Sequence, residues 1–315
     1  MVDFGVRDPM SFFLALDAGG TKTDYVLADE TRELARVRTG TIKRMRVDAA
    51  TASQNLDSAL AQLSAQTGVS MASITRTCVG TAGETVPLVK DWLQASINAR
   101  VGGGLLILGD VEIALDAAFP GGAGVLAMAG TGSNVLGRTS GGRLITAGGW
   151  GPALADQGSG HRIGLESLRA IFLAKDEERH TLLLPAVLDF WQLSSLDGLV
   201  EYANSLPAPD FSMLTGVVVR CAELGDEIAL AVLRQQGEEL AYLVRLVLRR
   251  LRLASNEPEW TPPIAFTGSI LENVASIRNA LIAAVQREFP NAQAPDKVVD
   301  PIDGALWRAR TGNFT

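Results

Sequence analysis

The sequence predicts an α/β protein in which two domains follow one plan. Its length of 315 residues fits two domains, since one domain usually spans about 100–200 residues. A strand, a glycine-rich turn and a further strand are expected at residues 14–27 and again at 125–136. Strands and helical segments then alternate along the chain, which is typical of an α/β architecture. We therefore expect two domains with a cleft between them.

The first repeat begins with an apolar run, Phe12–Leu16, which ends at Asp17 and is followed by two glycines. This pattern indicates a buried strand and a tight turn. The following elements are expected as strands at 23–28 and 34–37, a helix at 47–63 that ends near Gly68, a strand at 74–79, a helix at 85–97, a strand at 105–108 and a helix at 111–119 that starts at Asp110.

The second repeat is richer in helices. Strands are expected at 123–128, 134–137, 144–147 and, after a Pro-containing loop, 264–267. Apolar residues at helical spacing predict helices at 159–175, 182–193, 212–224 and 227–253. The second domain therefore carries a helical insertion before its last strand.

Composition narrows the function classes. The net charge of −7 argues against nucleic acid as a partner. No apolar run approaches the roughly 20 residues of a membrane span, and we expect no contact with a membrane. The start of the chain lacks a signal-peptide pattern, and Cys78 and Cys221 lack metal-type spacing, so we expect a reduced, cytoplasmic setting. A homodimer is compatible with the sequence.

Two glycine-rich turns are the strongest functional signals. Such turns expose backbone N–H groups, which suit phosphate oxygens, although either turn alone fits an ordinary hairpin. Because both follow similar strands, we interpret them as two jaws on a nucleotide triphosphate. No P-loop or dinucleotide-binding pattern occurs. The predicted phosphate-binding residues are Asp17, Gly19, Gly20, Thr21, Lys22 and Thr23 in the first turn and Gly130, Thr131, Gly132 and Ser133 in the second.

Two acidic residues in the motifs have chemical roles in this interpretation. Asp17 is predicted to hold Mg²⁺ through water, because Mg²⁺ combines carboxylate, water and phosphate ligands. Asp110 follows a strand and starts a helix. It fits either a helix cap or a catalytic base that accepts the proton of an acceptor hydroxyl.

The remaining candidates surround the substrate. Glycines flank Trp150 and allow the backbone to approach a ligand closely, while Asp156 fits either a helix cap or a hydrogen-bonding partner of sugar hydroxyls. Gly268 and Ser269 follow the last strand and are expected beside adenine. The predicted substrate-binding residues are Thr81, Asn134, Gly149, Trp150 and Asp156.

These motifs together resemble the BadF/BadG/BcrA/BcrD-type ATPase and N-acetylglucosamine kinase family of the actin/hexokinase/Hsp70 superfamily. The resemblance covers residues 14–310. It implies two RNase H-like domains around an ATP cleft, with residues 1–118 and a returning helix at 300–312 in the first and 119–299 in the second. It also implies Asp110 as the base, the two glycine turns around the phosphates, and Asn134 and Asp156 at the sugar.

The expected function is ATP- and Mg²⁺-dependent phosphorylation of an amino sugar, N-acetylglucosamine or glucosamine. Family members that act on sugars usually carry an asparagine after the third strand, where this chain has Lys43, Arg44 and Arg46. An acidic sugar such as N-acetylmuramic acid is therefore one alternative. The other is an ATPase that activates a 2-hydroxyacyl-CoA dehydratase, but Cys78 and Cys221 do not match positions that bind an iron–sulfur cluster.

Overall fold

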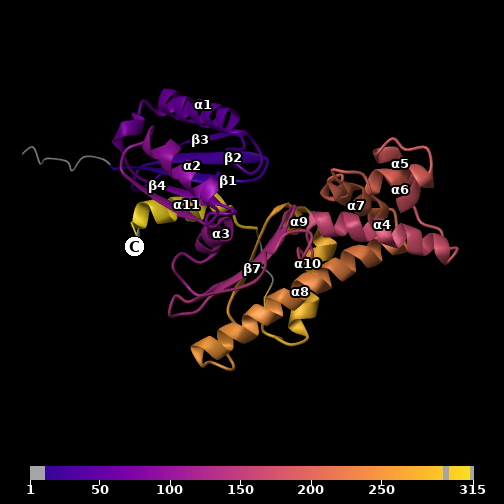
Figure 1. Ribbon diagram of the computed structural model, residues 1–315. Coiled ribbons are helices and arrows are strands. Elements are labelled where there is room, and N and C mark those ends of the chain that lie inside the picture. Colours follow the sequence, from indigo (N-terminus) through magenta and orange to yellow (C-terminus); the bar gives the residue numbers. More distant parts are fainter. Residues whose placement is uncertain (1–10, 294–297, 313–315) are drawn as a thin grey trace, which may run out of the picture. The chain divides into compact units, whose positions relative to one another are not determined.

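The computed structural model describes residues 11–293 and 298–312, and these form two compact units. Unit 1 contains the chain up to Gly122 together with the segment from Val299 onward, and unit 2 is Ala123–Val298. Figure 1 colours them along the sequence, with the C-terminal helix returning to unit 1.

Unit 1 is built on a five-stranded sheet in the order β3-β2-β1-β4-β5. The strands β1 (Phe12–Ala18), β2 (Lys22–Ala28) and β3 (Glu33–Gly40) are antiparallel neighbours, whereas β4 (Ile74–Thr81) and β5 (Gly104–Leu108) run parallel to β1. The register places Ala18 opposite Thr81 and Gly80 opposite Leu108. The parallel strands therefore end together at one edge of the sheet, where ligand-binding residues commonly gather.

Alternation along β1 builds two cores in unit 1, because successive side chains point to opposite faces. Leu14 and Leu16 pack with the helices α1 (Ala49–Thr67) and α2 (Pro87–Asn98). Phe13 and Ala15 belong to the core on the other face, with α3 (Asp110–Ala118) and α11 (Pro301–Thr311). A single 3₁₀ turn, η1 (Met71–Ser73), precedes β4. Both faces of the sheet are thus covered.

Unit 2 repeats the first four strands of this plan. Its sheet has the order β8-β7-β6-β9, with β6 (Gly124–Ala129), β7 (Ser133–Arg138) and β8 (Leu144–Gly148) antiparallel and β9 (Ile264–Thr267) parallel to β6. The correspondence with β3-β2-β1-β4 confirms the structural repeat, and the predicted α/β class with two domains on one plan is correct.

Helices make up most of unit 2 and share one continuous core with its sheet. The longest, α8, packs against α4, α10 and the strands. The helical elements are α4 (Gly160–Asp176), α5 (Leu183–Phe190), α6 (Leu196–Ala203), η2 (Phe211–Leu214), α7 (Thr215–Glu223), α8 (Glu227–Ser255), α9 (Ser269–Asn273) and α10 (Ala275–Gln286). Figure 1 shows α8 running beside α10 through this unit.

Local chemistry moves several predicted boundaries. The helix expected from residue 47 starts at Ala49, because the Asp48 side chain accepts the Thr51 N–H at 2.8 Å as an N-cap. The helix expected at 85–97 starts at Pro87, a favoured first helical residue. The expected helix 212–224 is a 3₁₀ turn followed by α7, and α6 and α10 were not predicted.

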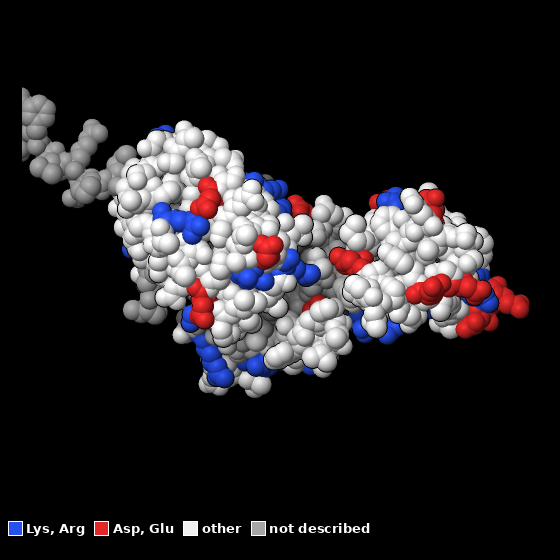
Figure 2. All heavy atoms as spheres, turned by 45° about the horizontal axis from the view of Figure 1, so that its top comes forward, with Lys and Arg blue, Asp and Glu red and all other residues white. Residues whose placement is uncertain are grey.

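The surface is chemically mixed. On the face shown in Figure 2, basic and acidic side chains lie interspersed rather than in one field of a single sign. Among residues 11–293 and 298–312, no helix is long and apolar enough to cross a membrane.

Candidate active site

The β1–β2 hairpin holds the first predicted phosphate turn. Asp17 lies near the end of β1, partly buried, and Gly19, Gly20 and Thr21 form the connection to β2, in which Gly19 is half-buried and the other two residues are exposed. A Cβ atom on Gly19 would lie 3.1 Å from the carbonyl oxygen of Lys22, so a larger residue would crowd the turn. The backbone of this turn is therefore open to a ligand on its outer side.

The Lys22 and Thr23 side chains of the same motif differ in their exposure. Lys22 is exposed and lies 3.9 Å from the Asp24 carboxylate. Thr23 is fully buried, and its hydroxyl oxygen accepts the Ile42 N–H at 3.2 Å. Lys22 can thus reach a bound anion, whereas Thr23 tethers the segment that follows β3.

A second carboxylate, Asp110, lies in the same unit, close enough to Asp17 for its charge to raise the pKa of that residue. Asp110 is the first residue of α3, and Gly80 on β4 leaves space for this helix, because a Cβ atom there would lie 2.0 Å from Cδ1 of Ile113. The Asp110 carboxylate accepts the Val111 N–H at 2.8 Å. The N-cap of α3 is Gly109, so Asp110 does not serve as the helix cap.

Burial and mutual repulsion set the proton affinity of the two carboxylates. Burial, followed by the charges of Asp110, Asp24 and Asp300, raises the pKa of Asp17 to about 7. Burial is also the largest cause that raises the pKa of Asp110, with the Lys43 ammonium acting in the opposite direction. Asp110 therefore sits in an environment that makes a carboxylate a stronger base than it is in water.

The segment 41–47, which we call the basic loop, packs against the first turn. The Thr41 hydroxyl donates to the Gly19 carbonyl at 2.6 Å, and its N–H donates to the Thr21 carbonyl at 3.2 Å. A Cβ atom on Gly20 would lie 3.8 Å from Nε of Arg46. The basic loop thus belongs to the surroundings of the predicted phosphate turn and is not a separate surface loop.

The three cations of the basic loop differ in their surroundings. The Arg44 guanidinium donates to the Val47 carbonyl and closes the loop on itself. Lys43 is partly buried, and burial lowers its pKa while the charges of Asp110 and Glu84 raise it. Lys43 therefore interacts with the predicted catalytic carboxylate, and Arg46 lies against the phosphate turn.

Thr81, at the end of β4, is buried, and its hydroxyl donates to the Ala18 carbonyl at 3.1 Å. This bond ties the ends of two parallel strands together next to Asp17. The Thr81 side chain is engaged in holding the site's frame.

Unit 2 carries the second predicted turn between β6 and β7. The Gly130 N–H donates to the Gly132 carbonyl at 2.9 Å, and the Gly130 carbonyl accepts the Gly160 N–H at 2.8 Å. The Ser133 hydroxyl donates to the Gln157 carbonyl at 2.8 Å. The turn is therefore braced by the start of α4, and Thr131 remains exposed at its tip.

Asp156 lies against this turn rather than capping a helix. Its carboxylate accepts the Ser133 N–H, and a Cβ atom on Gly132 would lie 3.0 Å from its Oδ2. The N-cap of α4 is Ser159, whose side chain accepts the Arg162 N–H. Asp156 is 4% exposed with a φ of 68°, a left-handed conformation that few non-glycine residues adopt. Strain of this kind is often retained at functional sites.

The glycines after β8 make room for Asn134. Gly149 has a φ of 74°, and a Cβ atom on it would lie 2.6 Å from Nδ2 of Asn134. The Asn134 oxygen accepts the Thr146 hydroxyl at 3.1 Å. Trp150 stands next to them and is 73% exposed, a high value for a tryptophan in a folded protein. Asn134 and Gly149 are in contact, whereas Trp150 extends into solvent.

The last predicted pair, Gly268 and Ser269, joins the same edge of unit 2. Because β9 runs parallel to β6, both strands end beside Gly130, and a Cβ atom on Gly130 would lie 3.8 Å from the Ser269 hydroxyl oxygen. Gly268 has a φ of 94°, and a Cβ atom on it would lie 2.4 Å from the Ala129 carbonyl oxygen. Within unit 2 the structure therefore gathers the second turn, Asp156 and Gly268–Ser269.

Residues 14–309 match the model of the BadF/BadG/BcrA/BcrD ATPase family. The chain belongs to this family.

Several proteins to which this chain is similar are named as sugar kinases. An N-acetylmuramic acid/N-acetylglucosamine kinase of Clostridium acetobutylicum is 25% identical, over 96% of this chain and 99% of the relative. An N-acetyl-D-glucosamine kinase of Dictyostelium discoideum is 28% identical, over 94% of this chain and 97% of the relative. A crystal structure from Chromobacterium violaceum, provisionally described as an N-acetylglucosamine kinase, is 25% identical, with a TM-score of 0.75, and covers 94% of this chain and 98% of that one.

The sequence motifs did not include every charged group of the candidate site. Glu84 follows β4, lies near Gly109 and acts electrostatically on both Asp110 and Lys43. Its signal was an acidic residue just after a strand parallel to β1, the same signal that identified Asp110. Asp300, which adds to the negative charge around Asp17, lies at the N-cap of α11 and carried no local motif.

The donor set of unit 1 fits Mg²⁺ held largely by water and phosphate. Within the described part of the chain, no group of three or more His, Cys, Asp or Glu side chains converges to bind a metal directly. Asp17 instead lies in a field made negative by Asp110, Asp24 and Asp300. A divalent cation with most of its ligands from water and phosphate suits such a place.

Proposed function

We propose that this protein is an ATP-dependent kinase that phosphorylates a hydroxyl of an amino sugar, N-acetylglucosamine or glucosamine. The observation that carries the proposal is Asp110, a partly buried carboxylate beside Asp17 at the edge of unit 1 where the parallel strands end. Membership of an ATPase family and the sugar-kinase activity named for its relatives support the same reaction.

In the proposed reaction Asp110 accepts the proton of the acceptor hydroxyl as the phosphoryl group arrives. Asp17 would hold Mg²⁺ through water, and the metal would supply positive charge to offset the charge of the phosphates. Lys22 and the backbone of the Gly19–Gly20 turn bind phosphate oxygens. Lys43 stabilises the ionised form of Asp110 and so keeps it ready to accept a proton.

In this proposal, the residues of unit 2 bind further parts of ATP and of the sugar. The turn from Gly130 to Ser133 binds phosphate, and Gly268 with Ser269 lies beside adenine. Asn134, Gly149, Trp150 and Asp156 contact the sugar, because carboxylate and amide groups suit hydroxyl donors and an exposed indole suits the apolar face of a sugar ring. Thr81 contributes through the strand ends that its hydroxyl joins.

An acidic amino sugar is the second candidate acceptor. Lys43 interacts electrostatically with Asp110, and Arg46 lies against the Gly20 turn, so two cations of the basic loop are at the site. A carboxylate on the acceptor would form a charge-assisted bond with such a group. The relative named as an N-acetylmuramic acid/N-acetylglucosamine kinase supports this possibility.

The role of dehydratase activator is less well supported. Its iron–sulfur cluster would require accessible cysteine thiolates. Cys78 on β4 is fully buried, and burial raises the pKa of its thiol to about 12. Cys221 on α7 is also buried. Two thiols kept inside separate cores also support a reduced, cytoplasmic location.

The test is an assay of ADP release with Mg²⁺, ATP and a panel of sugars. N-acetylglucosamine, glucosamine, N-acetylmuramic acid and glucose would be compared at equal concentrations. The proposal predicts release that depends on an amino sugar and exceeds the rate with glucose. Equal release with and without any sugar would reject the kinase reaction.

A further inference from the structure

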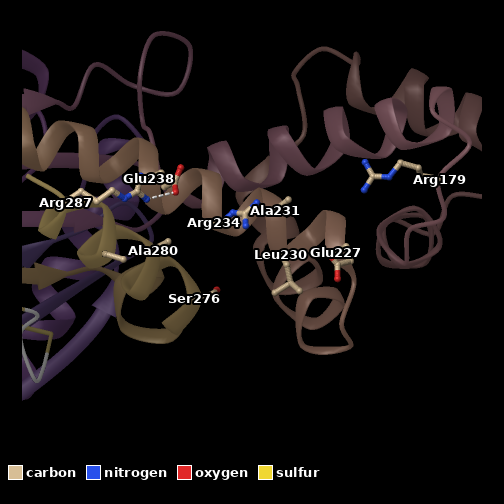
Figure 3. A pocket seen from close by; sticks show the side chains of 10 residues that line it. Arg179, Glu227, Leu230, Ala231, Arg234, Glu238, Ser276, Ala280 and Arg287 are labelled. Carbon is tan, nitrogen blue, oxygen red and sulfur yellow. Dashed lines mark hydrogen bonds and ion pairs between the residues drawn. The ribbon is translucent and has the colours of Figure 1, made fainter.

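The longest helix of unit 2, α8, has two faces with different surroundings. One face lines an open groove beside α10, and Figure 3 shows Arg234 and Glu238 on this side of the helix. Gln236 lies between these two residues in the sequence, and residues two apart on a helix differ by about 200° around its axis. Gln236 therefore projects from the opposite face of α8, where it is fully buried.

A fully buried glutamine requires a physical reason, because burial of an amide is costly unless the amide forms hydrogen bonds. The Oε1 atom of Gln236 accepts the N–H of Gly158 at 3.1 Å, although the two residues are 78 positions apart in the chain. An apolar side chain of similar size would fill the same space but would leave this N–H without its acceptor. The amide of Gln236 therefore serves the segment that contains Gly158.

This segment, residues 155–159, is called the Asp156 segment below, and it doubles back tightly on itself. Asp156 and Gly158 both have left-handed φ values, 68° and 79°. The Ser159 N–H donates to the Asp156 carbonyl at 3.0 Å. Because most of the segment is buried, its backbone groups depend on partners within the protein. A strained backbone of this kind persists only where its surroundings hold it in place.

The Asp156 segment is held from two sides. On the side of the sheet, the Asp156 carboxylate accepts the Ser133 N–H. On the side of α8, Gln236 holds the Gly158 N–H. The helix also lies directly against the backbone there, because a Cβ atom on Gly158 would lie 2.8 Å from the Cβ atom of Leu240. The position of α8 is thus transmitted to the segment through Gln236.

We propose that Gln236 is a positioning residue for the sugar, which fixes the Asp156 segment and so holds the Asp156 carboxylate where the sugar hydroxyls bind. This inference rests on the assignment of Asp156 to the sugar in the proposed reaction. The phosphate turn of unit 2 has a brace of its own, because the Gly130 carbonyl accepts the Gly160 N–H at 2.8 Å. Loss of the Gln236 bond should therefore weaken the binding of the sugar more than the binding of ATP.

The test is steady-state kinetics on the full chain, with Gln236→Met as the main variant. Methionine is flexible and unbranched like glutamine, but its thioether is only a weak acceptor. The KM for N-acetylglucosamine, or for glucosamine if that sugar reacts faster, should rise about tenfold, while the KM for ATP stays within about twofold. Gln236→Leu, which removes the acceptor with a different shape, should give the same pattern.

The next residue along α8 offers a matched control. Gln235 is exposed, and its amide donates to the Glu239 carboxylate at 2.9 Å. Gln235→Met removes the same chemical group from the same helix without touching the Asp156 segment. It should leave both KM values unchanged, and circular dichroism would verify that every variant is folded.

Two further variants identify the contact through which Gln236 acts. Gln236→Glu keeps an acceptor oxygen, and at about pH 6 burial favours the uncharged form of its carboxyl group. Its KM for the sugar should stay within about twofold of the wild-type value at the same pH. Asp156→Asn should raise the KM for the sugar with little change in the backbone, since asparagine tolerates left-handed φ values. Adding Gln236→Met to Asp156→Asn should then raise this KM little further.

Four outcomes would overturn the proposal. These are an unchanged KM for the sugar in Gln236→Met, an equal rise of both KM values, a Gln236→Glu variant as impaired as Gln236→Met, and additive effects in the double variant. An unchanged KM for the sugar in Asp156→Asn would show that Asp156 does not bind the sugar, and the positioning role would fall with it. Failure of the kinase reaction is distinguishable from all of these, because the wild-type protein would then phosphorylate no sugar.

Discussion

Replacement of Asp17 by asparagine should stabilise unit 1 while it weakens catalysis. In the folded protein, burial and the charges of Asp110, Asp24 and Asp300 raise the pKa of Asp17 to about 7, from an ordinary value of 3.8. The folded state therefore binds this proton more tightly than the unfolded state does. The contribution of Asp17 to the free energy of unfolding is therefore fully present below pH 3.8, and it falls as the pH rises toward 7.

The pKa shift of Asp17 sets the largest effect that this group can have on the free energy of unfolding. One pKa unit corresponds to about 1.4 kcal/mol, so the ionised Asp17 side chain destabilises the fold by up to about 4 kcal/mol at pH 8 and by less than about 2 kcal/mol at pH 5. An uncharged asparagine of nearly the same shape removes this penalty. Asp17→Asn should therefore gain more stability at pH 8 than at pH 5.

Urea unfolding at both pH values, in buffer with EDTA, measures this difference. Asp29→Asn is the matched control in the same unit, because hydrogen bonds from Thr31 and Arg32 lower the pKa of Asp29 to about 2. That carboxylate stabilises the fold at neutral pH, so its replacement should destabilise. An equal effect of Asp17→Asn at pH 5 and pH 8, or a loss of stability at pH 8, would refute the electrostatic reasoning.

Three further substitutions test the site. Asp110→Asn should lower kcat by roughly 10²–10⁴-fold and leave the ATP affinity measured by calorimetry unchanged. Near-normal turnover would show that Asp110 is not the catalytic base. If the acceptor is acidic, Lys43→Met should lower kcat/KM for N-acetylmuramic acid about tenfold relative to kcat/KM for N-acetylglucosamine. Arg44→Ala should leave this ratio unchanged. An unchanged ratio in Lys43→Met would reject the acidic sugar as the acceptor. Gly149→Ala should displace Asn134, which lies 2.6 Å from the new Cβ, and should therefore raise the KM for the sugar about tenfold without changing the KM for ATP. A raised KM for ATP with an unchanged KM for the sugar would show that Asn134 does not bind the sugar.

Much of the fold could be predicted from sequence because its signals are local. The apolar run before Asp17 and the run before Gly130 each mark a buried strand and a turn, and the structure has β1 and β6 there. The repeat of these signals predicted the related sheets of the two units. The helix α10 was missed because it starts without a side-chain cap, whereas α6 was missed although Ser195 caps its first turn.

The candidate site was harder to predict from the sequence, because part of it consists of residues that lie far apart in the chain. Asp110 and Asp156 each had a helix-cap interpretation that sequence alone left open, and the structure assigns the caps to Gly109 and Ser159 instead. Glu84 and Asp300 influence the carboxylates only because the strands and α11 bring them to one edge of unit 1. Spacing along the chain cannot reveal such electrostatic neighbours.

The fate of the γ-phosphoryl group is the most direct test of the proposed reaction. Purified protein would be incubated with Mg²⁺, ATP and N-acetylglucosamine or glucosamine, and mass spectrometry and phosphate analysis would follow the products. A sugar kinase predicts one phosphorylated amino sugar for each ADP formed, with little inorganic phosphate. Stoichiometric inorganic phosphate with no sugar phosphate would show an ATPase instead and would contradict the account.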